Sequence, residues 1–209
     1  MLHRTRFKAE KEGSFPLPKF AANLSFLYQA LPFLDRIAQA ARDGFGAVEY
    51  VSPYEFDSGA IAQALSPPGS SQALFNLPAG DWAGGERGIG CLPDRVEEFR
   101  QGVSTAIAYA RTLGCTTVNC LAGLAPAGAD PAKLDRTLID NLSYAAPRLA
   151  DAGINLVIEP INRRDMPSFH LATTRPCGTH HERGEVEQSQ DPVRFLSHAD
   201  HARRSDADF

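Results

Sequence analysis

The sequence alternates between short apolar segments and longer amphipathic ones, and this alternation limits the folds that the chain can adopt. The short segments are rich in aliphatic and β-branched residues, which favours β-strands, and the longer ones carry apolar residues at helical spacing. Strands that alternate with helices pair in parallel, with right-handed crossovers. The predicted strands are 20–24, 47–51, 72–77, 116–121 and 154–159, and the predicted helices are 32–42, 58–65, 93–113 and 131–150.

The predicted loops differ in character at the two ends of the strands. Loops that follow strands are long and rich in glycine and polar residues, as in 78–88, whereas loops that precede strands are short. In (β/α)8 barrels the loops after the strands form the active site. We therefore predict an α/β protein with a partial (β/α)8 TIM barrel in residues 19–175. About five β-α units are present. The barrel is partial because a full one has eight such units and takes about 250 residues.

A carboxylate ends the fifth predicted strand. Residues 154–158 are mostly apolar, Pro160 stops further strand pairing, and Glu159 therefore occupies the last position of a buried strand. A carboxylate there is costly unless it is paired or binds a cation. The carboxyl ends of parallel strands are also where ligands bind. Glu159 is the main candidate for a catalytic residue, and a carboxylate that caps the next loop is the alternative.

Composition narrows the classes of partner. The formal net charge is -4 and 22% of the residues are charged, which gives no reason to propose nucleic acid or a membrane as partner. No apolar run approaches the roughly 20 residues that span a bilayer. The four cysteines lack CxxC spacing, so we expect reduced thiols in a cytoplasmic protein.

The two ends of the chain lack the alternating pattern. Residues 1–18 are polar and aperiodic, which predicts a disordered extension or a miscalled start. Residues 176–209 hold four of the six histidines, and only Val193, Phe195 and Leu196 form an apolar cluster. We expect a disordered tail there, and metal binding by these histidines is the weaker alternative because they lack ligand spacing.

Several separated motifs resemble those of the hydroxypyruvate isomerase family, which has a xylose-isomerase-like TIM barrel. The resemblance implies an intramolecular oxidoreductase that interconverts hydroxypyruvate and tartronate semialdehyde, or a relative that acts on a larger 2-oxo acid. It also implies two opposed glutamates that bind a divalent metal cation together with an aspartate and a glutamine. Glu159 matches the first glutamate, and the resemblance implies that it is both a catalytic and a metal-binding residue. The motifs are Phe20–Ser25, Asn76–Trp82, Gly85–Ile89, Val118–Gly123, Ile158–Asn162 and Phe169–Arg175.

Further candidates for binding the small 2-oxo acid lie in or beside these motifs. Arg87 can hold the substrate carboxylate with its fork of donors, or form an ion pair with Glu86. Glu49 can bind substrate or order a loop, and Asn119 points into the barrel mouth or into its core. His170 lies over the site or in a solvated loop.

The loop 78–88 contains Asp81 and Trp82. We expect these two residues to pin the loop, with Trp82 buried as an anchor.

The resemblance ends at about Arg175, before the other three implied ligands. The family continues there with a block like N-L-K-I-Q-Y-D-x-Y-H-M-Q. One set of synonymous codons for Gln190–Ala202, translated one base later, gives K-I-Q-Y-D-F-Y-H-M-Q-I-M. We hypothesise a one-base frameshift near 175–177, so that 176–209 is out of frame. The nucleotide sequence of the gene tests this directly.

Two further expectations follow from the resemblance, one about the start of translation and one about activity. Leu17–Phe20 is similar to the family's Met-Pro-Lys/Arg-Phe start, which predicts that translation begins at position 17. We also expect the chain as written to be inactive, because a lone glutamate lacks the opposing residue for the second proton transfer. A non-enzymatic fragment is the alternative function class.

Overall fold

The structure, a computed structural model, describes residues 19–66, 70–173 and 193–195. Strands and helices alternate as the sequence predicts, with boundaries that differ by one or two residues. The elements are β1 (Ala21–Asn23), α1 (Phe33–Arg42), β2 (Ala47–Tyr50), α2 (Ser58–Ala64), β3 (Ser71–Asn76), the 3-10 helix η1 (Pro93–Arg95), α3 (Val96–Leu113), β4 (Thr117–Cys120), α4 (Pro131–Asp151), β5 (Asn155–Ile158) and β6 (Val193–Phe195).

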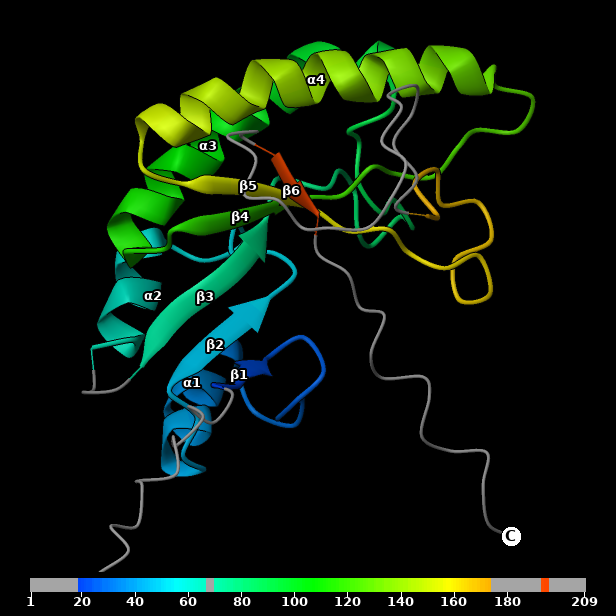
Figure 1. The fold of residues 1–209 in the computed structure, drawn as a ribbon. Coiled ribbons are helices and arrows are strands. Elements are labelled where there is room, and N and C mark those ends of the chain that lie inside the picture. Colours follow the sequence, from blue (N-terminus) through cyan, green and yellow to red (C-terminus); the bar gives the residue numbers. More distant parts are fainter. Residues whose placement is uncertain (1–18, 67–69, 174–192, 196–209) are drawn as a thin grey trace, which may run out of the picture.

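All six strands form one parallel sheet, and their order in space is their order in the sequence. Figure 1 shows the helices lying along one side of the curved sheet. The predicted α/β architecture with five consecutive parallel strands and interleaved helices is thus confirmed. No helix in the described ranges is long and apolar enough to cross a membrane.

The main core lies between the sheet and the helices. Alternate residues of each strand face it, as the period of two in a strand requires. Val118 and Cys120 of β4 belong to this core, and so do Leu156 and Ile158 of β5. Helices begin and end at residues suited to those positions: Asp130 accepts a hydrogen bond from the backbone N–H of Ala132 at the start of α4.

A second apolar cluster lies beyond the carboxyl ends of β4 and β5, and we call it the Phe169 cluster. The loop after β4 meets the loop after β5 in an isolated antiparallel bridge between Leu124 and Phe169. The Phe169 side chain is 1% exposed. The buried members of the cluster are Ala79, Cys91, Leu121, Ala122, Leu134, Leu138 and Phe169.

Strand β6 corrects the sequence prediction at three residues. Val193–Phe195 lies in the segment expected to form a tail, yet it pairs in parallel with Leu156–Ile158 of β5. Valine and phenylalanine favour strands, and β5 would otherwise present an unpaired edge. Residues 174–192 and 196–209, as well as the predicted extension 1–18, lie outside the described residues.

Candidate functional site

A row of polar side chains lies on the face of the sheet opposite the main core, at the carboxyl ends of the strands. Asn119 stands between the core residues Val118 and Cys120, so its side chain projects to the other face. It is in register with Val157, which is buried outside the main core. Glu159 follows Val157 by two residues and lies just after β5, where it is half-buried.

Two hydrogen-bonded pairs order this row. The Asn23 Nδ2 group donates to Glu49 Oε1 over 2.9 Å, between β1 and β2. The Asn119 Nδ2 group donates to Asn76 Oδ1, also over 2.9 Å, between β4 and β3. Sequence reasoning missed Asn23 and Asn76 as site residues, although both lie inside the recognised motifs.

The Asn119 side chain therefore lies on the face opposite the helices, which both expected positions, the barrel mouth and the barrel core, share. The residue is 1% exposed, and its Oδ1 atom accepts no hydrogen bond within the described part of the chain. A buried acceptor without a donor costs about 1–3 kcal/mol. This atom can accept a hydrogen bond from a ligand hydroxyl or from water.

The loop after β3 holds Arg87 against its own backbone and against the Trp82 ring. Its Nη1 group donates to the backbone oxygens of Trp82 (3.0 Å) and Glu86 (2.7 Å), and its Cζ atom lies 4.1 Å from the centre of the Trp82 ring. The expected Arg87–Glu86 ion pair is wrong, because Glu86 Oε1 pairs with Arg95 Nη1 at 2.6 Å. Trp82 is 39% exposed, so the expectation of a buried anchor is also wrong.

Asp81, in contrast, does pin this loop. Its Oδ1 atom accepts from the backbone N–H of Gly84 at 2.8 Å, and its own N–H donates to Glu86 Oε2. These contacts close the loop by short-range hydrogen bonds, as an Asx turn does.

His170 is neither solvated nor directed at the row of polar side chains. Its Nε2 atom lies 2.8 Å from Asp135 Oδ1 on α4, and its side chain is 9% exposed. Its backbone N–H donates to the Gly123 oxygen at 2.9 Å. The ring therefore joins the loop after β5 to the helix layer.

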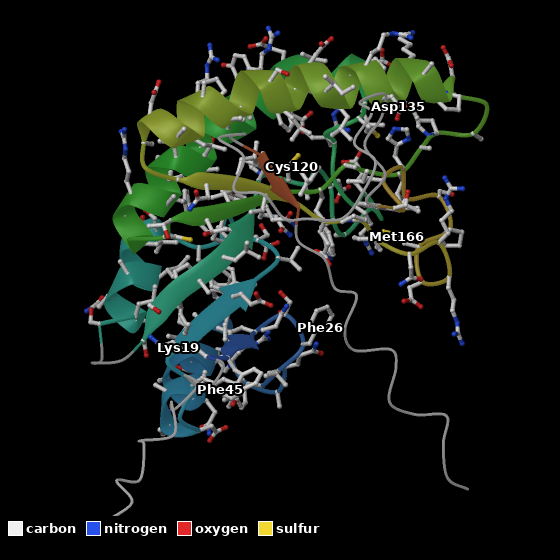
Figure 2. The ribbon with its side chains drawn as sticks, in the orientation of Figure 1. Lys19, Phe26, Phe45, Cys120, Asp135 and Met166 are labelled. Atoms are coloured by element: carbon white, nitrogen blue, oxygen red, sulfur yellow. The ribbon has the colours of Figure 1, made fainter. Side chains whose placement is uncertain are left out.

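A cavity of about 630 Å³ opens over the carboxyl ends of β1, β2 and β3. Phe26, which lies on the loop after β1 and is 73% exposed (Figure 2), is one of its lining residues. Arg36 also lines it and donates to the backbone oxygens of Leu24 and Leu31, at 2.9 Å each. Sequence reasoning missed Arg36, since its acceptors depend on the path of the loop. The aromatic side chains around the cavity are Phe26, Phe33, Tyr50, Tyr54, Phe56 and Trp82.

Few of these side chains could bind a metal ion. No group of three or more histidine, cysteine, aspartate or glutamate residues that could hold a metal ion occurs within the described ranges. A hard divalent cation takes about six oxygen ligands. Of the implied ligand set, the described residues supply Glu159 alone and do not fit a complete site.

Comparisons with known proteins agree on one family. Residues 37–175 match the family described as xylose isomerase-like TIM barrel. The chain is 50% identical to hydroxypyruvate isomerase of Escherichia coli K12 over 157 residues, which cover 75% of this chain and 61% of the relative. It is 47% identical to 2-oxo-tetronate isomerase of Cupriavidus necator, covering 74% of this chain and 60% of the relative. The chain thus spans about three fifths of the length of these curated relatives.

Solved structures give the same result. A Brucella melitensis protein described as AP endonuclease, family 2, superposes with a TM-score of 0.71 at 44% identity, covering 74% of this chain and 60% of that one. D-psicose 3-epimerase from Clostridium cellulolyticum H10 superposes with a TM-score of 0.56 over 70% of this chain and 53% of that one. At 12% identity, the second likeness concerns the fold alone.

Proposed function

The chain belongs to the xylose isomerase-like TIM-barrel family, and from this premise we propose that its site isomerises a short 2-oxo acid, with hydroxypyruvate and tartronate semialdehyde as the pair. The observation that carries the proposal is the position of Glu159, half-buried at the carboxyl end of β5 and on the mouth face of the sheet. A relative named hydroxypyruvate isomerase, identical at 50% of the aligned positions, supports it.

The reaction moves a carbonyl between adjacent carbons by proton transfer. In the proposed first step, the Glu159 carboxylate takes the proton from C3 of hydroxypyruvate, and the electrons of the C3–H bond form an enediolate. Return of a proton to C2, with transfer of the C3 hydroxyl proton to the C2 oxygen and movement of the double bond to the C3 oxygen, gives the aldehyde. General acid-base catalysis of this kind contributes typically 10²–10⁴-fold to the rate.

Three other candidate side chains suit the rest of such a substrate. Arg87 can bind its carboxylate, because a guanidinium pairs with carboxylates through two parallel hydrogen bonds. Asn119 can accept a hydrogen bond from its hydroxyl group, through the unpartnered Oδ1 atom. Glu49, fixed by Asn23, can bind substrate or order the loop after β1. His170 is not part of the proposal, since Asp135 holds its ring.

We assign no step to the divalent cation that the resemblance implies, because the described residues do not form its site. We also propose a cytoplasmic location. Cys91, Cys115 and Cys120 are all free thiols, which is usual where thiols are kept reduced.

Exchange of the C3 protons of hydroxypyruvate in D₂O tests the first proton transfer by itself. We expect the purified chain to accelerate this exchange with little net isomerisation, because the described residues supply one of the two carboxylates implied. Glu159→Gln should slow the exchange by about 10²–10⁴-fold. Glu55→Gln, a carboxylate in the cavity wall, is the matched control and should retain it.

The same assay separates the alternatives. Equal exchange in wild type and Glu159→Gln contradicts the role of Glu159. Exchange absent from the wild type favours a non-enzymatic fragment, and faster exchange on 2-oxo-tetronate favours the activity named for the Cupriavidus necator relative.

A further inference from the structure

The loop that carries Arg87 is closed on itself at several points. The Gly88 N–H donates to the Ala79 oxygen at 3.0 Å, and the Glu86 N–H donates to the Asp81 oxygen at 2.9 Å. The Glu86 side chain returns to the same place, where its Oε2 atom accepts from the Asp81 N–H at 2.5 Å. Glu86 thus bridges the two sides of the loop.

Arg95 connects this loop to a rigid helix. Its Nη1 group contacts Glu86 Oε1 at 2.6 Å, while its Nε and Nη2 groups contact the two carboxylate oxygens of Glu98 at 2.5 and 2.7 Å. Glu98 lies in the first turn of α3, which packs against the sheet through Phe99 and Val103. One guanidinium therefore joins a surface loop to a helix of the main core.

The Glu86 carboxylate has little freedom in this position. Gly80 has a φ of +81°, and a Cβ atom added there would lie 2.0 Å from Glu86 Oε2. The carboxylate therefore packs directly on the glycine backbone, which only a residue without a side chain allows at this φ. The Arg95 ion pair also holds the pKa of the Glu86 carboxyl below its usual value, so the carboxylate is charged at neutral pH.

The outer side of the loop carries the stacked pair of Arg87 and Trp82. Both hydrogen bonds of Arg87 use Nη1, so its Nε and Nη2 groups donate to no described residue. No ion pair within the described part of the chain involves Arg87. The hydrogen bonds from Nη1 to the backbone of the loop therefore orient the guanidinium.

We propose that Arg95 is a positioning residue: by holding Glu86 against Gly80 and Glu98 against α3, it fixes the Arg87–Trp82 pair so that the guanidinium receives the carboxylate of a 2-oxo acid. The identity of this ligand rests on the proposed function, whereas the positioning of the loop does not.

Trp82 gives a direct readout of the loop, because it is the only tryptophan in the chain. In Arg95→Met we expect Trp82 to lose its guanidinium partner, which exposes the second face of the ring. Acrylamide quenching of its fluorescence should rise about twofold and its anisotropy should fall. Arg100→Met is the matched control, because Arg100 contacts Glu97 at 3.9 Å on an exposed face of α3.

Two further variants keep the test decisive if Arg95→Met disturbs the whole fold. Glu86→Gln loses the charge but keeps an acceptor for Asp81, so the quenching should lie between wild type and Arg95→Met. Arg95→Lys can contact one carboxylate but not both, and should restore part of the anisotropy. Wild-type quenching and anisotropy in both Arg95→Met and Glu86→Gln overturns the proposal.

Titration with hydroxypyruvate separates this proposal from the proposed function. We expect Trp82 fluorescence to saturate in the wild type, with about tenfold weaker affinity in Arg95→Met and no response in Arg87→Met. If the quenching differs between variants but hydroxypyruvate gives no saturable response in the wild type, the loop is positioned by Arg95 and the proposed ligand is wrong. Equal affinity in wild type and Arg95→Met contradicts the positioning role.

Discussion

The carboxyl end of the sheet has two halves that are held together by different forces. Over β1, β2 and β3 the loops leave a cavity of about 630 Å³ and expose Phe26 and Trp82. Over β4 and β5 the loops pack into the Phe169 cluster, whose central ring is 1% exposed. We call these the open half and the closed half.

The difference coincides with the two roles proposed above, proton transfer and carboxylate binding. The closed half includes the loop after β5, where Glu159 lies. Burial of apolar side chains stabilises this half by about 25 cal/mol per Å² of apolar surface removed from water. The open half is held by arginines on backbone oxygens and carboxylates, such as Arg36 and Arg95. Polar contacts near the surface contribute little each and exchange readily with water. The proposed proton-transfer group thus stands on the half that is packed by apolar side chains, and the proposed carboxylate-binding group stands on the half that is held by polar contacts.

The largest expected effect lies in the closed half. Phe169→Ala removes a fully buried ring and should lower the free energy of unfolding by about 3–5 kcal/mol. Phe26→Ala, in the open half, should change it by less than about 0.5 kcal/mol, since Phe26 is 73% exposed. Urea denaturation of both variants measures the contrast, and equal losses would remove the distinction between the halves.

An intermediate effect is expected at the border between the halves, where Asn76 accepts from Asn119. Asn76→Ala leaves the buried Asn119 amide without its acceptor and should cost about 1–3 kcal/mol of unfolding free energy. Asn155→Ala is the control, because Asn155 donates to the Thr116 oxygen on the exposed side of β5 and should cost less than about 0.5 kcal/mol.

A double variant refines the position of this border. If the losses in unfolding free energy of Asn76→Ala and Phe169→Ala add within about 0.5 kcal/mol, the closed half begins at β4. Stronger coupling between the two losses extends it to β3. If Asn76→Ala lowers the unfolding free energy no more than Asn155→Ala does, the hydrogen bond between Asn76 and Asn119 contributes no measurable stability.

The smallest effect is the response of the open half to acid. Arg95 holds the pKa values of the Glu86 and Glu98 carboxyls below their usual range, chiefly through its hydrogen bonds to them. The resulting stabilisation is complete above the unfolded pKa of about 4.3 and is lost as the pH falls through the folded values. Trp82 anisotropy should therefore be constant from neutral pH down to about 5 and fall below about 4.

Arg95→Met supplies the control for this titration. It should begin with the low anisotropy and show no such step in acid. A wild-type step centred above pH 5 would have the wrong sign for carboxyl groups with lowered pKa values.

The sequence predicted the regular elements well because their signals are local. Hydrophobic periodicity and the glycines before and after helices depend on residues a few positions apart. The same locality puts Glu159 at the end of β5, since a polar residue that follows an apolar strand can be recognised from the strand alone.

The contacts that distinguish the two halves join residues that are far apart in the sequence, and these were missed. His170 contacts Asp135 across 35 positions. Arg95 and Glu86 are nine positions apart, and they pair because the loop folds back on itself. Strand β6 was missed because three residues are too few for a periodic signal, while the unpaired edge that they cover exists only in the folded sheet.

The order of the sheet has a consequence for how the protein is made. Every strand from β1 to β6 pairs beside the one that precedes it in the chain. A ribosome adds about 5–20 residues per second, so a β-α-β unit of roughly 30 residues emerges within seconds. Each new strand can then pair with the strand that emerged before it, so the sheet can extend in one direction during synthesis.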